Sequence, residues 1–518
     1  MHIFHSRLPD VPIRDQSITE RVFENLVTRP DDIVLTDGPT GRSLTAAAFM
    51  DQVRRLAGGL TEAGFGAGHV VAIMAPNLPE FCAVFHAVAF AGGTITTINP
   101  TYTAPEVTHQ LNDAGAELLI TVGPFLEVAQ AGITGTKVRQ IAVIGETEGA
   151  TPLSALMGQP MQAQVPVDLD RHVLALPYSS GTTGLPKGVM LSHRNLVVNV
   201  DQIIAAAGFR AGETAAGFLP FFHIYGMTVL MNVHLAGGGA VVTMPRFDLE
   251  LFLRINQDYK SQRMWIVPPV ALALAKHPMI DQFDLSSVEQ VFSGAAPLGA
   301  ELSNAVQDRL GCVSLQGYGM TELAPVSHVT PVAANRPGGS GLQVPNTQCR
   351  IVDPTTGQDQ GPGQEGELWV KGPQVMLGYL NNAKATKETL DPDGWLHTGD
   401  IAYIDEDGYM FIVDRLKELI KYKGFQVAPA EIEATLVSIP GITDAAVVGQ
   451  PDPEAGEIPV GFVVRAEGGP DEAAIKAHLA QQLAHYKQLQ RIIFADTIPK
   501  SASGKILRRL LRDQLKAG

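Results

Sequence analysis

Residues 178–188 constrain the fold most, because they place glycines, hydroxyl side chains and one lysine directly after an apolar run. The segment reads YSSGTTGLPKG, and residues 173–176 before it read VLAL. Such an apolar run indicates a buried strand, and ligands of α/β proteins bind where buried strands end. Glycines let backbone N–H groups approach an anion, and hydroxyls and an ammonium bind phosphate oxygens, so the sequence predicts a phosphate-binding loop. Its expected contacts are Ser179, Ser180, Gly181, Thr182, Thr183 and Lys187.

The spacing excludes two better-known phosphate loops. Lys187 lies between a proline and a glycine, so the pattern G-x-x-x-x-G-K-[ST] is broken. No complete G-x-G-x-x-G follows a strand either, because Glu322 stands where a third glycine after Gly317 and Gly319 belongs. A Gly/Ser-rich surface linker is the competing interpretation, and the apolar run before the segment disfavours it.

Composition indicates a globular protein of two or more domains. The chain has 518 residues, more than one hydrophobic core usually supports, and it is 45% hydrophobic and 18% charged. Its formal net charge of −15 disfavours a nucleic-acid partner. Cys82, Cys312 and Cys349 show no CxxC spacing, so we expect reduced thiols and no metal cage.

No targeting or membrane-spanning segment is expected. The first ten residues lack a basic segment followed by an apolar run. The most apolar window, residues 81–93, is too short to span a bilayer. Together with the reduced thiols, these features predict a cytoplasmic protein.

Hydrophobic patterning divides the chain into three parts. From about residue 70 to residue 316, strand-like runs alternate with helical stretches, which predicts helix-covered, mainly parallel sheets. Short β-type runs from about residue 341 predict a small antiparallel or barrel-like unit. Mixed helices and strands resume beyond Asp414, where Pro429 suits the first turn of a helix. Strands are expected at residues 70–74, 118–122, 141–144, 240–243, 265–267, 366–370 and 409–413, and helices at residues 105–114 and 249–259.

Six motifs in one order make the chain resemble the adenylate-forming enzymes, which comprise acyl-CoA synthetases, peptide-synthetase adenylation domains and beetle luciferases. Besides residues 178–188, they are SGAAP at 293–297, QGYGMTE at 316–322, GWLHTGD at 394–400, VDRLKELIKYKGFQ at 413–426 and PKSASGK at 499–505. They span most of the chain, and the resemblance is nearest to the 4-coumarate:CoA ligases. It implies an α/β fold with a large domain of residues 1–416, a β-rich subdomain at about 341–414, and a small mobile α+β lid of residues 417–518 that hinges at Lys417.

The resemblance implies a two-step reaction. A carboxylate attacks the α-phosphate of ATP to give an acyl-AMP and pyrophosphate, and coenzyme A then takes the acyl group. Two like charges about 4 Å apart repel by roughly 4 kcal/mol at an effective dielectric constant near 20, so cations must lie between the reactants. Lys505, in a loop of small residues, is the expected central cation. Without the other motifs it would be interpreted as a solvated lysine beside Arg508, Arg509 and Arg512.

The matching motif positions imply further contacts with the nucleotide. Glu322 is expected to bind Mg²⁺, which prefers oxygen ligands, and Thr321 to contact a phosphate oxygen. Asp400 is expected to accept hydrogen bonds from the ribose hydroxyls, with Arg415 beside the ribose or a phosphate. The adenine would lie against Tyr318 and the backbone at Ala295, and Gln316 and Gly317 complete the expected set.

A second set of residues is expected to serve the coenzyme A step, after the lid has rotated and withdrawn Lys505. By resemblance, Lys423 and Gly424 would border the pantetheine channel, and Arg246 would face the phosphates of CoA. The expected contacts with the adenylate are Lys417, Lys421 and Gln426, and Lys421 is also expected to be catalytic. A solvated charged face is the competing interpretation of these lysines.

The expected acid pocket is small and apolar. By resemblance His223 would gate it, and its walls would be Tyr225, Phe292, Ala295, Gly317, Pro325 and Val326. Such a slot suits a flat or extended acyl group. Val229 stands where plant ligases place a polar residue toward the phenol, so a strong preference for a hydroxylated acid is not expected.

The leading hypothesis is an ATP-dependent acid:CoA ligase that uses Mg²⁺ and coenzyme A and acts on a hydroxycinnamate, such as 4-coumarate, or a related aryl acid. A medium-chain fatty acyl-CoA synthetase and a stand-alone enzyme that loads a carrier protein stay open. No carrier domain follows Lys505, which weakens the peptide-synthetase interpretation, and residues 223–225 resemble the ligases rather than the luciferases. A non-catalytic nucleotide sensor is disfavoured because it would not need Lys505.

Overall fold

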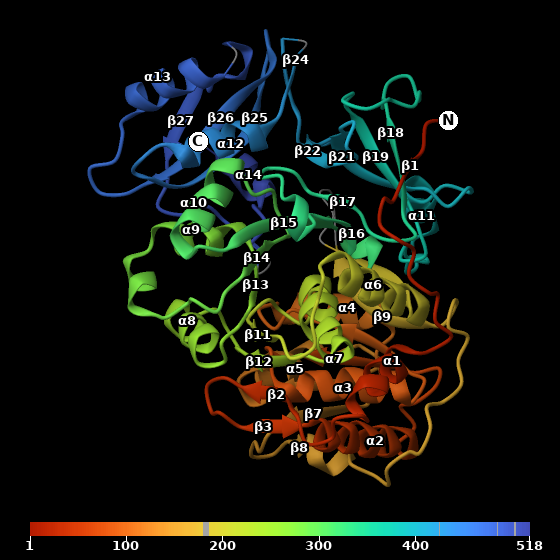
Figure 1. The fold of residues 1–518 in the computed structure, drawn as a ribbon. Coiled ribbons are helices and arrows are strands. Elements are labelled where there is room, and N and C mark those ends of the chain that lie inside the picture. The colour runs from red at the N-terminus through yellow and green to blue at the C-terminus, as the bar shows by residue number, and fades with distance from the viewer. Residues whose placement is uncertain (180–185, 424, 484, 502–503, 518) are drawn as a thin grey trace.

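The computed structural model describes residues 1–179, 186–423, 425–483, 485–501 and 504–517, with the side chains of Gln426 and Ala517 left aside. Figure 1 shows helix-covered sheets below, a curled antiparallel sheet at the upper right and a separate C-terminal region at the upper left. The mixed α/β class predicted from the sequence is confirmed.

An eight-stranded sheet carries the strand that precedes the predicted phosphate loop. Its order is β20-β10-β9-β5-β4-β6-β7-β8, and it is parallel from β9 to β8. β9 ends at Ser179, and β10 returns antiparallel from Lys187, which pairs with Ser179. The predicted strand is confirmed, but both ends of the 178–188 segment belong to strands, and residues 180–185 lie outside the described residues. The strands are β4 (Val70–Met74), β5 (Thr94–Thr97), β6 (Leu118–Val122), β7 (Gln140–Ile144), β8 (Thr151–Pro152), β9 (Val173–Ser179), β10 (Lys187–Ser192) and β20 (Gly378–Tyr379).

Helix α3 (Pro79–Phe90) explains the most apolar window of the sequence. All its residues except Glu80 are buried, because it packs between α1 (Ile18–Leu26) and α2 (Ala46–Glu62). Pro79 is the first residue of the helix, where a backbone N–H has no acceptor within the helix, so proline costs no hydrogen bond there. No helix among the described residues is long and apolar enough to cross a membrane. The other helices of this part are α4 (Ala104–Ala114), α5 (Leu126–Gly132) and α6 (His193–Ala206).

Two smaller sheets complete the lower part of the molecule. One has the order β11-β12-β2-β3, and the other, β13-β14-β15-β16-β17, is parallel at first and antiparallel from β15 on. The strands are β2 (Ile33–Asp37), β3 (Ser43–Thr45), β11 (Thr214–Gly217), β12 (Ala240–Thr243), β13 (Arg263–Ile266), β14 (Gln290–Ser293), β15 (Val313–Gly319), β16 (Val326–Val329) and β17 (Leu342–Gln343). The helices are α7 (Val233–Gly237), α8 (Leu249–Asp258), α9 (Pro268–Lys276) and α10 (Ala300–Leu310). Short 3₁₀-helices are η1 (Gly123–Phe125), η2 (Leu153–Leu156), η4 (Pro278–Gln282), η5 (Thr321–Leu323) and η6 (Val332–Ala334), and η3 (Tyr225–Asn232) is a π-helix. A further 3₁₀-helix, η7 (His485–Lys487), belongs to the C-terminal region.

The predicted β-rich unit is an antiparallel five-stranded sheet of order β1-β18-β19-β21-β22. It differs from the prediction at its edges. The chain's N-terminal end supplies β1, and β20 leaves the unit to pair with β10. Both strands have only two residues, too few to show alternation in the sequence. The elements are β1 (Phe4–His5), β18 (Gln348–Val352), β19 (Gly366–Lys371), β21 (Leu396–Ile404), β22 (Met410–Arg415) and helix α11 (Ala383–Thr389).

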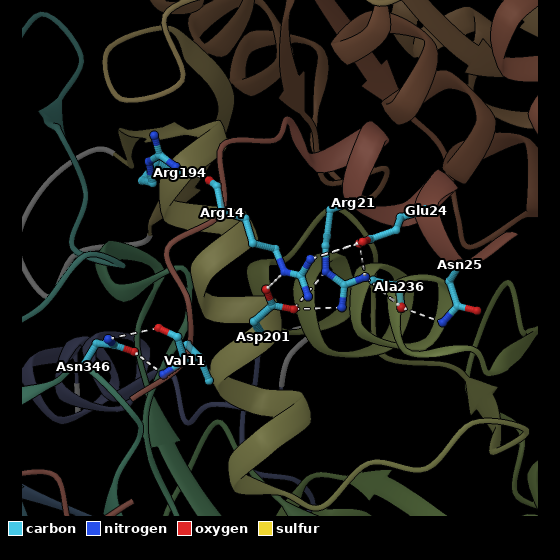
Figure 2. A network of polar contacts seen from close by, with 9 residues as sticks. All are labelled: Val11, Arg14, Arg21, Glu24, Asn25, Arg194, Asp201, Ala236 and Asn346. Carbon is cyan, nitrogen blue, oxygen red and sulfur yellow. Dashed lines mark hydrogen bonds and ion pairs between the residues drawn. The ribbon is translucent and has the colours of Figure 1, made fainter. Parts of the chain in front are cut away.

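Residues 6–16, which we call the N-terminal strap, connect β1 to α1 of the lower part. Figure 2 shows the contacts of two strap residues, Val11 and Arg14. At one end, Asn346 exchanges two hydrogen bonds with the backbone of Val11. At the other, Arg14 and Arg21 both bind Asp201 of α6, at 2.6 and 2.8 Å. Arg21 and Asp201 are buried, so this network is largely shielded from water. The strap therefore ties the β-rich sheet to the lower part of the molecule.

The C-terminal region has its own sheet and its own core. Its sheet runs β24-β23-β26-β25, with β27 beside β26. The core includes Ile432 and Leu436 of α12, which begins at Pro429 as predicted. The elements are β23 (Ile420–Tyr422), β24 (Phe425–Val427), β25 (Ile442–Asp452), β26 (Gly456–Arg465), β27 (Arg491–Phe494), α12 (Pro429–Ser438), α13 (Glu472–Gln482) and α14 (Arg508–Ala517).

Candidate active site

Three residues of the predicted nucleotide set contact one another. Tyr318, on β15, donates a hydrogen bond to Asp400 Oδ2 at 2.5 Å, and Arg415 Nε lies 3.2 Å from Asp400 Oδ1. Asp400 and Arg415 face each other across β21 and β22. Burial and the adjacent Asp400 carboxylate raise the pKa of Tyr318 well above its usual value, so its hydroxyl stays protonated and donates. The fold brings these side chains together from two sheets, because β15 belongs to one and β21 and β22 belong to the other.

Glu322 lies in η5 and is held by a residue that the sequence did not single out. Tyr379, on β20, donates a hydrogen bond to Glu322 Oε1 at 2.7 Å. The ring of the same tyrosine lies 4.8 Å from Lys187 Nζ. One side chain therefore joins the predicted metal ligand to the lysine of the predicted phosphate loop. Thr321 is buried beside Glu322.

The turn at residues 294–298 is shaped by its own backbone and by Gln316. Ala295 has a φ of +70°, which places it in the left-handed region. Gln316 accepts a hydrogen bond from the Leu298 N–H and donates to Gly339 O at 3.2 Å. Its amide is thus occupied by protein groups and positions the turn. A Cβ at Gly317 would lie 3.1 Å from His328 O, so the strand and its neighbour approach closely there.

Tyr225, one of the residues of the predicted acid pocket, lies against β13 and β14. Its hydroxyl donates to Ile266 O at 3.3 Å, and burial raises its pKa. A Cβ at Gly294 would lie 3.1 Å from the ring, so the glycine leaves room for it. Phe292 is buried on β14, and Val229 is buried in η3 within the main core. Pro325 and Val326 lie at the start of β16, where Asn199 Oδ1 accepts the Val326 N–H at 3.0 Å.

Lys505 reaches the lower part of the molecule from the C-terminal region. The neighbouring Gly504 has a φ of +81°, and a Cβ on it would lie 3.5 Å from Val267, at the start of α9. Burial lowers the pKa of Lys505 to about 8; Arg415 lowers it too, whereas Glu418, Asp400 and Glu322 raise it. Burial also lowers the pKa of His223 to about 4, and the Lys505 charge adds to this shift. Lys505 is therefore electrostatically coupled to residues of both predicted pockets.

The described side chains predicted for the coenzyme A step are exposed, in contrast to the buried nucleotide residues Asp400 and Glu322. Lys417, Lys421 and Lys423 are exposed, and Lys423 adopts a φ of +48°. Arg246 is exposed just after β12. Gly424 lies outside the described residues, as do residues 180–183 and the side chain of Gln426. Their proposed roles stay predictions.

Sequence reasoning identified Lys505 but missed two residues, Tyr379 and Glu418, that contribute hydrogen bonds or charge to the site. Tyr379 belongs to a two-residue strand, and only the apolar run before Asn381 could have drawn attention to it. Glu418 directly follows Lys417 and contributes to the pKa of Lys505. Its position inside the 413–426 motif was a signal, but only the fold shows that it faces Arg508 at 2.9 Å.

Comparison with known proteins gives one consistent result. The family described as AMP-binding enzyme matches residues 22–380, and the AMP-binding enzyme C-terminal domain matches residues 431–505. The chain is 43% identical to 4-coumarate--CoA ligase 5 of Oryza sativa subsp. japonica, covering 100% of this chain and 98% of the relative, and 42% identical to 4-coumarate--CoA ligase of Pinus taeda, covering 100% and 98%. Among solved structures, the anthranilate CoA ligase AuaEII with anthranoyl-AMP superposes with a TM-score of 0.91 at 26% identity, covering 98% of each chain. ATP-bound MatB from Rhodopseudomonas palustris gives a TM-score of 0.87 at 29% identity, covering 97% of this chain and 99% of that one.

Proposed function

This chain belongs to the AMP-binding enzyme family, and from that membership we propose that it is an ATP-dependent acid:CoA ligase. It forms an acyl-AMP and pyrophosphate from a carboxylic acid and ATP, and then transfers the acyl group to coenzyme A. The observation that carries the proposal is the coupling of Lys505 to Arg415, Asp400 and Glu322. Lys505 is a cation brought from a separate region to the expected nucleotide residues, and a cation at this place is what the joining of two anions requires.

In the adenylation step, the acid's carboxylate oxygen attacks the α-phosphorus, and pyrophosphate leaves with the electrons of the broken P–O bond. Lys505 stabilises the charge that collects on the α-phosphate and on the carboxylate. Asp400 and Arg415 orient the ribose, and Tyr318 offers the adenine a face. Residues 179–183 and Lys187 hold the outer phosphates, and Thr321 adds a hydroxyl.

Mg²⁺ is part of the proposal, because Glu322 suits it. The described residues hold no cluster of three or more His, Cys, Asp or Glu side chains arranged for a metal ion. Mg²⁺ commonly takes one or two carboxylates together with phosphate oxygens and water, so a single buried carboxylate fits an ion that arrives with ATP. The ion supplies neutralisation of phosphate charge.

For the thioester step, we propose that residues 417–518 form a lid that rotates about Lys417. Rotation withdraws Lys505 and brings Lys423 and Gly424 to the pantetheine, opposite Arg246. Lys417, Lys421 and Gln426 contact the adenylate. The exposure of the three lysines in the present arrangement supports a role in a different one.

We propose a hydroxycinnamate such as 4-coumarate, or a related aryl acid, as the substrate, because curated relatives that match the whole chain are named 4-coumarate--CoA ligases. His223 would gate the pocket, and Tyr225, Phe292, Pro325 and Val326 would line it. Val229 offers no hydrogen bond to a phenol, so cinnamate and 4-coumarate should differ by less than about tenfold in kcat/KM. A cytoplasmic location is also proposed, supported by three free, buried cysteines.

Two assays test the proposal. Pyrophosphate release should depend on added acid, and free CoA should accept the acyl group. Release without acid dependence would instead fit a nucleotide sensor, and failure of free CoA as acceptor would fit an enzyme that loads a carrier protein. A panel of cinnamate, 4-coumarate, ferulate and straight-chain acids tests the substrate class. A tenfold advantage for straight-chain acids would replace the aryl acid by a medium-chain fatty acid.

A further inference from the structure

We propose that Asp414 is a positioning residue that holds the C-terminal region in the arrangement that delivers Lys505, and that its contact with Ala430 must break before the coenzyme A step. This inference rests on the proposed function, because it assumes two half-reactions served by one rotating region. It adds a specific contact that favours the first of them.

The contact crosses the proposed hinge. Asp414 is the penultimate residue of β22, three residues before Lys417, and is buried. Its Oδ2 accepts the backbone N–H of Ala430 at 3.0 Å, and its Oδ1 accepts the Arg415 N–H at 2.7 Å. Ala430 lies in the first turn of α12, so the carboxylate caps a helix of the C-terminal region from outside that region.

Helix α12 has no cap of its own. Its N-cap residue is Ala428, which makes no side-chain hydrogen bond, whereas α13 is capped locally by Asp471. Uncapped N–H groups are unfavourable when buried, and the positive end of a helix attracts a carboxylate. The Asp414 carboxylate therefore stabilises α12 only while the two parts stay in the present arrangement.

Holding α12 also holds Lys505. Arg508 lies in α14, three residues after Lys505, and binds Glu433 of α12 at 3.0 Å, Glu418 at 2.9 Å and Val447 O at 3.1 Å. All these partners follow Lys417, so they move as one unit when the region rotates. The Asp414 contact, in contrast, has one partner on each side of Lys417 and must break.

The surroundings of Asp414 agree with a releasable contact. Leu419 and Ala428 form only a small apolar cluster with Ile401 and the partly buried Val413. Burial raises the pKa of Asp414 to about 6, and the nearby Arg508 opposes this rise. A desolvated carboxylate gains hydration when the joint opens, so the cost of opening is smaller than the hydrogen bond alone suggests.

The experiment compares the two half-reactions in Asp414→Ala and Asp414→Asn. Adenylation is measured as acid-dependent pyrophosphate exchange, and thioester formation is measured from supplied acyl-AMP and CoA. The ratio of adenylation to thioester formation should fall about tenfold in Asp414→Ala, which is within the range for loss of a helix cap, and less in Asp414→Asn, which keeps an acceptor oxygen.

Asp471→Ala is the matched control, because Asp471 caps α13 through Ala474 N at 2.8 Å with both partners inside the C-terminal region. It should lower the melting temperature and leave the ratio unchanged. Equal losses of both half-reactions in the Asp414 variants, or a ratio within about twofold of the wild-type ratio, would overturn the inference, since a helix cap is commonly worth more than that.

A distance measurement tests the joint independently of activity. Nitroxide labels at Glu388→Cys and Glu472→Cys, two exposed positions on either side of the joint, report its arrangement. Asp414→Ala should broaden the distance distribution, and an unchanged distribution in this variant would contradict the inference. A wild-type protein without acid-dependent pyrophosphate exchange would refute the proposed function, whereas the labels would still report on the contact.

Discussion

The N-terminal strap and the Asp414 contact both join parts of the molecule that are distant in sequence, but they are built differently. The strap lies between the β1–β18 strand pair and α1. Its Val11 exchanges two hydrogen bonds with Asn346, and its Arg14 shares the buried Asp201 with Arg21 of α1 (Figure 2). The joint near Lys417 has one carboxylate that caps a helix and a small apolar cluster. The first arrangement suits a fixed joint, and the second suits the joint that opens in the proposed rotation.

The largest expected effect follows from removing Lys505, the cation that the proposed movable joint would deliver. Lys505→Ala should lower the rate of adenylation about a thousandfold, as loss of a group that stabilises transition-state charge commonly does. Thioester formation from supplied acyl-AMP should change little. Pyrophosphate exchange and thioester assays measure both rates.

Lys500→Ala is the control for this substitution, because Lys500 lies on the same segment and pairs with Asp444 at 2.6 Å. It should leave adenylation nearly unchanged. Equal loss of both half-reactions in Lys505→Ala would mean that one arrangement serves both steps, and the contrast between the two joints would lose its functional meaning.

Breaking the strap should affect stability rather than the balance of the two steps. Asp201→Ala removes the buried carboxylate that Arg21 binds and leaves it only the more exposed Glu24, and we expect the free energy of unfolding to fall by about 3 kcal/mol. Urea denaturation measures this change. Arg254→Ala, which breaks the exposed pair of Arg254 with Glu250, should have almost no effect. A shift in the half-reaction ratio of Asp201→Ala would show that the strap is not a fixed joint.

Tyr379→Phe tests the fixed part of the site at the level of one hydroxyl. Loss of its bond to Glu322 should raise the Mg²⁺ concentration needed for half-maximal adenylation about tenfold, because bonds to charged groups contribute about 1.5–3 kcal/mol. Tyr379→Leu also removes the ring beside Lys187 and should raise the KM for ATP as well. Calorimetric titration of MgATP gives a second readout, and identical behaviour of the two variants would refute the separate roles of hydroxyl and ring.

The smallest effect concerns pH. Burial and Arg415 lower the pKa of Lys505 to about 8, so the side chain is charged below that pH and neutral above it. The kcat/KM for adenylation, which reports the free enzyme, should therefore be about halved at pH 8 and fall further above it. Lys505→Arg keeps its charge, and any activity it retains should decline only at higher pH. A profile that stays flat to pH 9 in the wild type would contradict this cause.

The local hydrophobic pattern predicted strands where an apolar run is long enough to be recognised. Strands expected at residues 70–74, 118–122 and 240–243 have those bounds in the structure, because buried apolar runs between turns leave few alternatives. The two-residue strands β1 and β20 and the π-helix η3 carry no such pattern, and the sequence did not predict them. Their existence depends on partners hundreds of residues away or on the packing around Tyr225.

The amino-acid sequence by itself determined the family, the class of fold and the identity of the charged and hydroxyl residues expected at the site, because glycines, hydroxyls and lysines in fixed spacing are local features. Only the tertiary structure decided that Tyr379 holds Glu322, that Asp414 caps α12 and that two arginines of the N-terminal part share Asp201. Hydrogen bonds and ion pairs depend on distances of about 3 Å between atoms that the chain brings together only after folding. The sequence specifies which chemical groups are present, and the packing of sheets and helices determines which of them come into contact.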